Sequence, residues 1–147
     1  MPMILNNNLP LFKGMFVLNP DTYKVCKIDS IGEIYIKVDT SPLSYGKSLI
    51  YPVIITSLRL NSFGFSSFKD DEKKVLYHEP KPENPDHDFY GEYDLREEYL
   101  LLSTAGRTIE LDRVKYMHQI QLALINLGFT NLALKTEIQT TGKINTL

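Results

Sequence analysis

Alternating apolar and polar residues dominate the first third of the chain. β-branched and aromatic residues recur in residues 15–18, 23–28 and 34–38, and Pro, Asn, Asp and Gly separate these runs. Residues of the first kind favour strands, and the separating residues favour tight turns. The pattern therefore predicts a small antiparallel meander of three strands.

The next segment predicts a loop, a strand and a short helix. Residues 41–47 contain one Pro and one Gly and predict a loop, and residues 49–55 predict a strand that Pro52 restricts to a sheet edge or a strand start. Thr56 is a suitable N-cap for a short helix that ends at Gly64. Three phenylalanines near the end of this helix are expected to be buried, namely Phe63, Phe65 and Phe68.

The middle of the chain is also rich in strand-forming residues. Residues 79–88 contain three prolines and several acids, and they predict a Pro-rich acidic loop because proline supports neither a helix interior nor a central strand. Four strands are predicted around this loop: residues 73–78, 90–95, 99–103 and 108–111.

The C-terminal part predicts one amphipathic helix over residues 112–127. Asp112 is its expected N-cap and Gly128 its stop. Apolar residues recur there at spacings of three and four, which places them on one face of a helix: Val114, Met117, Ile120, Leu124 and Leu127. We expect Phe129 and Leu132 to fold back on this helix, and residues 1–10 and 136–147 to be frayed.

Together these elements predict an α+β fold: an antiparallel sheet, a short middle helix and a C-terminal helix. The length of 147 residues, with 43% hydrophobic and 23% charged residues, is typical of one globular domain, so residues 1–147 are interpreted as a single domain. No apolar run is long enough for a membrane span, and the N-terminus lacks the features of a signal peptide. The single Cys26 also fits a cytoplasmic protein, because it can form no intramolecular disulfide.

Charge is distributed unevenly along the sequence. Residues 79–98 carry eight acids against Lys81 and Arg96, whereas the net charge of the whole chain is −2. A solvated loop and hairpin edge would explain this segment. The alternative is a negative surface that docks into a basic groove of a partner. The candidate partner-binding residues are Glu79, Glu83, Asp86, Asp88, Glu92, Asp94, Glu97 and Glu98.

Metal-ligand residue types cluster only around the acidic loop. The cluster consists of His78, Glu79, Asp86, His87 and Asp88, and two imidazoles with a carboxylate could hold a divalent ion. The spacing matches no compact metal motif, so a solvated loop is the favoured interpretation. We expect no metal, no cofactor and no small-molecule substrate.

Two single residues could take part in catalysis. Cys26 would need a nearby base to become a nucleophile, and a half-buried strand cysteine is the favoured interpretation. His118 could act as a general base, but a histidine on the flank of an apolar stripe more often packs at a core edge and donates one hydrogen bond. The sequence therefore predicts a protein without catalytic residues.

Aromatic residues alternate with lysines in the predicted meander, as in Tyr23-Lys24 and Tyr35-Ile36-Lys37. Such a sheet could stack single-stranded bases. Any half-buried antiparallel strand shows the same alternation, so core packing is the favoured interpretation. A small RNA- or DNA-binding regulator is kept as the alternative function.

Two segments carry a family resemblance. Residues 51–56 together with Phe63-Gly64-Phe65 form a Pro-apolar-Thr segment that ends in Gly-Phe, and residues 114–122 form a Lys-Tyr-aliphatic-His-Gln helix. Together they resemble a group of small uncharacterised proteins of phages and mobile elements of Bacteroidetes-type bacteria. Ile54 stands where that group has a second Pro.

The resemblance implies a context and no catalytic residues. Small proteins of such origin often bind a host or phage macromolecule, and anti-CRISPR proteins inhibit a defence nuclease in this way. We therefore expect a non-catalytic, macromolecule-binding protein of phage or mobile-element origin. Its expected partner is a host or phage protein, such as a CRISPR effector with its guide RNA.

Overall fold

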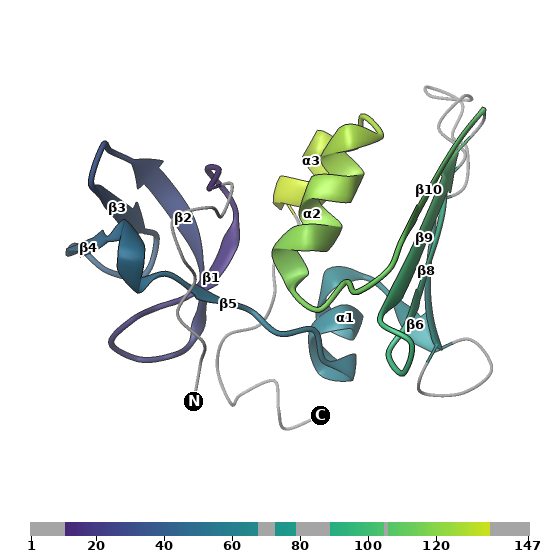
Figure 1. The fold of residues 1–147 in the computed structure, drawn as a ribbon, viewed down its shortest axis with the longest axis horizontal. Helices are drawn as coiled ribbons and strands as arrows, with labels where there is room; N and C mark the ends of the chain where they lie inside the picture. The colour runs from purple at the N-terminus through teal and green to yellow at the C-terminus, as the bar shows by residue number, and fades with distance from the viewer. Residues whose placement is uncertain (1–10, 68–72, 79–88, 105, 136–147) are drawn as a thin grey trace. The chain divides into compact units, whose positions relative to one another are not determined.

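The computed structural model describes residues 11–67, 73–78, 89–104 and 106–135. The described residues group into two compact units, one formed by residues 11–54 and 116–118 and the other by residues 55–115 and 119–135. Each unit contains an antiparallel sheet, and the chain also forms short helices. The predicted α+β class is therefore confirmed (Figure 1). The interpretation as a single domain stays a prediction.

The first unit is built on a five-stranded sheet with the strand order β4-β3-β2-β1-β5. All of its strand pairs are antiparallel, and a register shift between Ile28 and Ser30 marks a bulge in β2. The predicted three-strand meander is confirmed as β1 to β3. The elements of this unit are β1 (Phe16–Leu18), β2 (Val25–Ile31), β3 (Tyr35–Val38), β4 (Ser44–Gly46), the 3-10 helix η1 (Lys47–Leu49) and β5 (Tyr51–Pro52).

Two predictions for the segment after the meander need correction. Residues 41–47, predicted as a loop, contain strand β4 and the start of η1. The strand predicted over residues 49–55 is reduced to the two residues of β5. Pro52 lies in that edge strand, as expected for a residue that has no N–H to donate.

The core of the first unit lies against one face of its sheet. Alternation along β3 places Ile36 and Val38 inside and leaves Tyr35 and Lys37 exposed. The partly buried Leu11 and Phe12 pack against this core. Its buried members are Met15, Val17, Cys26, Ile28, Ile36, Val38, Tyr45 and Ile50.

The second unit contains the other five-stranded sheet, ordered β10-β9-β8-β7-β6, with every pairing antiparallel. The predicted strands of this region are confirmed, and β6 is an addition to them. Phe68 and residues 79–88 lie outside the described residues. The strands are β6 (Ser66–Ser67), β7 (Lys73–His78), β8 (Phe89–Asp94), β9 (Tyr99–Thr104) and β10 (Arg107–Leu111).

Helix α1 (Ser57–Phe63) begins and ends as the sequence predicts. The hydroxyl oxygen of Thr56 accepts a hydrogen bond from the backbone N–H of Arg59 at 3.1 Å, which satisfies a donor in the first helical turn. Gly64 ends the helix with a φ of 115°, a conformation that favours glycine. Phe63 and Phe65 are buried, as expected.

The C-terminal helix begins later than predicted. Helix α2 spans Met117–Asn126, so Asp112 is not its N-cap. Arg113 has a φ of +58°, which interrupts a right-handed helix, and the side chain of Gln119 accepts a hydrogen bond from the Lys115 N–H at 2.7 Å. The five apolar residues of the predicted stripe are all buried, which confirms their assignment to the core: Val114, Met117, Ile120, Leu124 and Leu127.

A further helix, α3 (Thr130–Lys135), follows where the sequence predicted only a folded-back segment. Gly128 has a φ of +95° and separates α2 from α3. The buried Gln121 donates a hydrogen bond from Nε2 to the backbone oxygen of Ala133 at 3.1 Å. This bond ties the two helices together.

Candidate functional site

The second sheet presents acidic side chains on one face. Successive residues of a strand point to opposite faces, so the buried Tyr93, Leu100 and Leu102 lie on the apolar face. The opposite face carries Glu92 and Asp94 of β8. By the strand register the same face carries Tyr99 of β9 and Glu110 of β10.

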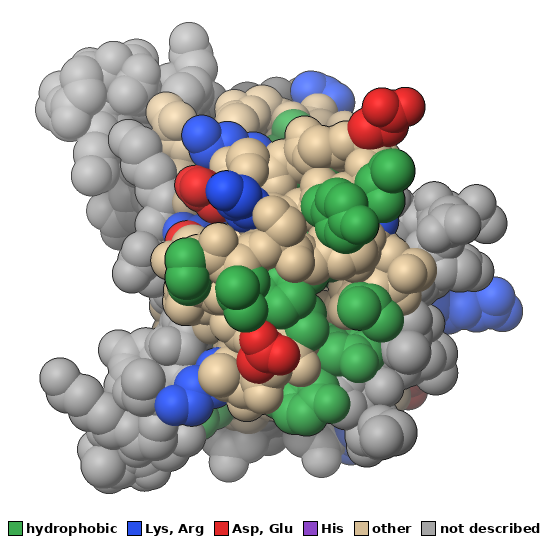
Figure 2. Space-filling view, turned by 90° about the vertical axis from the view of Figure 1, so that its left-hand side faces the viewer, with side chains coloured by type: hydrophobic (Ala, Val, Ile, Leu, Met, Phe, Trp, Pro, Cys, Tyr) green, Lys and Arg blue, Asp and Glu red, His purple; other side chains and the backbone are tan. Residues whose placement is uncertain are grey.

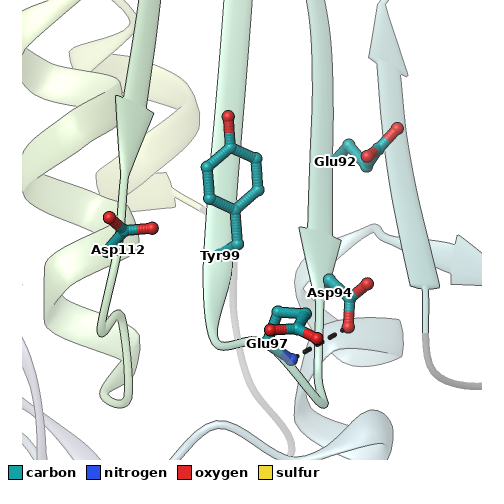
Figure 3. A pocket seen from close by; sticks show the side chains of 5 residues that line it. All are labelled: Glu92, Asp94, Glu97, Tyr99 and Asp112. Carbon is teal, nitrogen blue, oxygen red and sulfur yellow. Dashed lines mark hydrogen bonds between the residues drawn. The ribbon is translucent and has the colours of Figure 1, made fainter.

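A hollow of about 310 Å³ lies at one end of this face. Figure 3 shows the five lining side chains on one side of the sheet, drawn from three strand ends and one turn. Four of them are carboxylates, and the lining contains no basic side chain. We call this set the acidic hollow: Glu92, Asp94, Glu97, Tyr99 and Asp112.

The turn between β8 and β9 shapes one wall of the acidic hollow. The Asp94 carboxylate accepts hydrogen bonds from the backbone N–H groups of Arg96 at 2.9 Å and Glu97 at 3.1 Å, which is a common turn-forming use of aspartate. Figure 3 shows the bond to Glu97. Glu98 completes the turn with a φ of +54°. The turn thereby presents the Glu97 carboxylate beside Asp94.

Val114 holds the segment after β10 in place. Its N–H donates to the backbone oxygen of Glu98 at 2.8 Å, and its own backbone oxygen accepts a hydrogen bond from the Tyr93 hydroxyl. Burial raises the pKa of Tyr93, so this hydroxyl remains a donor at physiological pH. The segment that carries Asp112 is therefore attached to the turn that carries Glu97.

Tyrosine hydroxyls donate to carboxylates on the acidic face. Tyr99 donates to Oε1 of Glu110, and Tyr90 donates to Oε1 of Glu92 at 2.8 Å. The hydrogen bond to Glu110, followed by burial and the neighbouring negative charges, raises the pKa of Tyr99 to about 12. Tyr99 is therefore neutral near pH 7 and adds a polar wall without adding charge.

The chemistry of the acidic hollow suits a cationic group. Carboxylates form charge-assisted hydrogen bonds with lysine and arginine, and their two oxygens match the guanidinium fork of arginine. Within the described residues, no group of three or more His, Cys, Asp or Glu side chains is arranged to hold a metal ion. The lining is therefore chemically suited to a lysine or arginine side chain.

The structure brings together three of the eight predicted partner-binding residues. Glu92, Asp94 and Glu97 line the acidic hollow, and Glu98 lies in the adjoining turn. The remaining four predicted residues lie outside the described part of the chain: Glu79, Glu83, Asp86 and Asp88.

Sequence reasoning missed Tyr99, Glu110 and Asp112. By residue type alone, Asp112 is expected to cap a helix, and Tyr99 is expected to be an ordinary strand residue. The available signal was the pairing of the three predicted strands: once the hairpin turns are fixed, alternation places these residues on the same face as Glu92. The negative surface predicted from the acids of residues 79–98 could thus have been extended to Glu110 and Asp112.

The two residues considered for catalysis are buried. Cys26 lies in β2, and burial raises its pKa to about 11, which keeps the thiol protonated. Its side chain is more deeply buried than the half-buried strand position predicted.

His118 is only 4% exposed, and burial lowers its pKa to about 4. Its ring stacks on Tyr116 with centroids 5.8 Å apart. Nδ1 of His118 has no hydrogen-bond partner among the described residues. The expected burial is confirmed, whereas the expected hydrogen bond is not found at this atom.

The metal cluster considered in the sequence falls mainly outside the described residues. His78 ends β7, and residues 79–88, which contain Glu79, Asp86, His87 and Asp88, are not described.

The aromatic residues near the meander differ in burial. Phe12, which precedes the meander, packs on the core of the first unit. Tyr23 and Tyr35 are exposed by 50% and 57%, so the expected core packing does not hold for these two.

No helix in the described part of the chain is long and apolar enough to cross a membrane. Comparisons of the sequence and structure with protein-family models, with curated proteins and with solved structures give no match.

Proposed function

We propose that this chain is a non-catalytic binding protein that docks its acidic hollow on a basic surface of a partner protein. The observation that carries the proposal is the lining of the hollow, which consists of four carboxylates and one neutral tyrosine. A partner that inserts a lysine or arginine there would gain charge-assisted hydrogen bonds.

The acidic face would also attract a basic partner before the two proteins touch. Several carboxylates of one sign on one face create a negative potential, which attracts a basic surface over roughly the Debye length of about 10 Å and speeds encounter. Binding of this kind is expected to weaken as salt rises, mainly through a lower association rate. This salt sensitivity distinguishes the proposed docking from contact through apolar side chains.

The family resemblance supports a narrower form of the proposal. A protein of phage or mobile-element origin would use the acidic hollow against the basic nucleic-acid channel of an RNA-guided defence nuclease. Such a channel offers many lysines and arginines to a carboxylate surface. The protein would then inhibit the nuclease by occupying the path of its guide or target.

A cleavage assay with a co-resident RNA-guided nuclease tests the narrower form. We expect wild-type protein to slow target cleavage, and the double variant E97Q/D112N to require at least about tenfold more protein for the same inhibition. Both side chains are solvent-exposed, so these changes remove charge with little effect on packing. Full inhibition by E97Q/D112N would contradict docking through the acidic hollow, and no inhibition by wild-type protein would contradict the narrower form.

The matched control is the double variant D29N/E33Q. Asp29 and Glu33 are exposed acids of the first unit, so the control removes the same charge from another place. We expect it to inhibit as well as wild-type protein. An equal loss in both variants would show that only the net charge matters.

A second function, binding of single-stranded nucleic acid, is favoured by one observation. The exposed Tyr23 packs against Tyr51 with ring centroids 5.6 Å apart, and Lys24 follows directly in the chain. Exposed rings beside a cation can stack bases. Filter binding of a short single-stranded RNA at two salt concentrations tests this function. Salt-sensitive retention that is lost in Tyr23→Leu would support it, and the absence of retention would reject it.

A further inference from the structure

Among the residues that the structure describes, strand β4 forms one open edge of the first sheet. An edge strand presents backbone N–H and C=O groups to which another strand can pair, and proteins usually protect such edges with proline or charge. The opposite edge, β5, contains Pro52, which has no N–H. Strand β4 (Ser44–Gly46) contains neither proline nor a charged residue. It is the less protected edge of this sheet.

The hydrogen-bond register shows which groups of β4 point outward. The N–H of Lys47 donates to the backbone oxygen of Ile34 at 3.1 Å, and the pairing continues as Tyr35 with Gly46 and Ile36 with Tyr45. Because bonded and non-bonded pairs alternate in an antiparallel ladder, Tyr45 bonds to β3. The backbone groups of Ser44 and Gly46 then point away from β3, toward the open side.

Large apolar side chains surround this edge. Leu43, directly before β4, is 56% exposed, and Leu49 at the end of η1 is 45% exposed. Ile34, directly before β3, and Tyr35, the first residue of β3, are exposed by 65% and 57%. Figure 2 shows hydrophobic side chains gathered on this side of the molecule. Exposed apolar side chains gathered in this way are typical of an interaction surface.

The charged residues within the edge elements are basic, whereas acids lie around them, and one of these, Asp21, accepts a hydrogen bond from the Tyr45 hydroxyl at 2.8 Å. The charged residues of β3, β4 and η1 are Lys37 and Lys47, both exposed or partly exposed. Glu33 and Asp39 lie beyond the two ends of β3, and the Asp39 carboxylate accepts a hydrogen bond from the Lys27 N–H at 3.0 Å. A second copy of the chain on this edge would bring like charges together, whereas an acidic segment would be attracted.

We propose that β4 takes up an extended acidic and apolar segment of a partner protein as an additional antiparallel strand. The backbone groups of Ser44 and Gly46 would pair with the segment. Leu43 and Leu49 would contact its apolar side chains, and Lys37 and Lys47 its acids. Strand addition of this kind is a common mode of peptide recognition. The surface belongs to the first unit and prefers acids, so it is independent of the acidic hollow.

Gly46 permits a direct test of strand addition. Its φ of −63° and ψ of 142° suit proline, and a Cβ added there would lie 3.8 Å from the Ser48 hydroxyl, which is an ordinary contact. Gly46→Pro therefore removes one outward N–H while preserving the bonds to β3. Gly46→Ala preserves that N–H and is the matched control.

The probe is a short acetylated peptide in which glutamate and valine alternate, measured by calorimetry. We expect wild-type protein and Gly46→Ala to bind it alike, and Gly46→Pro to bind at least about tenfold more weakly, since the lost edge bond cannot be replaced. Circular dichroism checks that both variants fold. No binding by wild-type protein, or equal binding by Gly46→Pro, would overturn the proposal.

Further experiments distinguish the proposed acidic segment from other ligands of this edge. The double variant K37Q/K47Q is expected to bind the glutamate peptide more weakly, with no gain or loss toward a peptide of alternating serine and valine. A concentration-dependent dimer that Gly46→Pro abolishes would assign the edge to a second copy and overturn the proposal. Tighter binding of a short single-stranded RNA than of the peptide, lost in K37Q/K47Q, would overturn it as well.

Discussion

At the scale of single residues, His118 shows how burial sets charge. The ring is almost completely removed from solvent, and its Nδ1 has no partner among the described residues. Desolvation disfavours the charged imidazolium, which lowers the pKa of His118 from 6.5 to about 4. The ring is therefore neutral near pH 7, and it stacks on Tyr116.

The lowered pKa of His118 predicts acid sensitivity. Because the pKa is lower in the folded chain than in the unfolded chain, the full stability is present above pH 6.5 and is lost as the pH falls toward 4. Between pH 7 and pH 5 this residue alone is expected to lower the free energy of unfolding by about 2 kcal/mol. Urea unfolding of wild-type protein and His118→Leu at both pH values measures the effect.

The leucine variant also provides the control for this prediction. Replacing the ring removes the titrating group and its unpaired nitrogen, so the variant is expected to lose less stability between the two pH values. Other groups titrate equally in both proteins and cancel in the comparison. An identical pH dependence of the two proteins would contradict a lowered pKa at His118.

At the scale of elements, helix ends defined by local chemistry were predictable. Thr56 and Gly64 were identified from their residue types, because a hydroxyl cap and a glycine stop act within one turn of the chain. The strands of the meander were predictable for the same reason. Alternation and turn residues are local signals.

The cap of α1 leads to a stability prediction. Thr56→Ala is expected to lower the free energy of unfolding by about 1 kcal/mol, because the N–H of Arg59 loses its acceptor. Thr56→Ser keeps the hydroxyl and should stay within a few tenths of a kcal/mol of wild-type protein. Urea unfolding of the three proteins checks this. A serine variant as unstable as the alanine variant would show that the methyl group matters instead of the cap.

The start of α2 could not be predicted because distant residues determine it. Val114 is held by Tyr93 and Glu98, and Tyr116 pairs with Ile54 in an isolated bridge. These backbone groups are therefore used by partners far away in the sequence and are not available to a helix. Asp112, a good cap by its residue type, lines the acidic hollow instead.

Strand β4 was missed for a related reason. Its three residues contain a serine and a glycine, and only Tyr45 favours a strand by its residue type. The pairing with β3 and the bonds from the Tyr45 hydroxyl to Asp21 and Ser41 stabilise it. Contacts of this kind depend on the tertiary fold and leave no local pattern.

At the scale of the whole molecule, the uneven charge was the most informative feature of the sequence. It indicates Glu92, Asp94 and Glu97 as candidate binding residues, and in the structure these three line one hollow together with Tyr99 and Asp112. Each unit carries its own proposed binding surface. The second unit offers carboxylates to a basic partner, and the first offers an open strand edge with lysines.

The most direct test of the central proposal is to locate where a basic ligand binds. Isotope-labelled protein would be titrated with a short oligoarginine peptide and followed by backbone amide NMR shifts. We predict saturable shifts at the residues of the acidic hollow, strongly reduced in E97Q/D112N and unchanged in D29N/E33Q. Shifts that spread evenly over the acids of both units, or that persist in E97Q/D112N, would contradict the acidic hollow as the docking site.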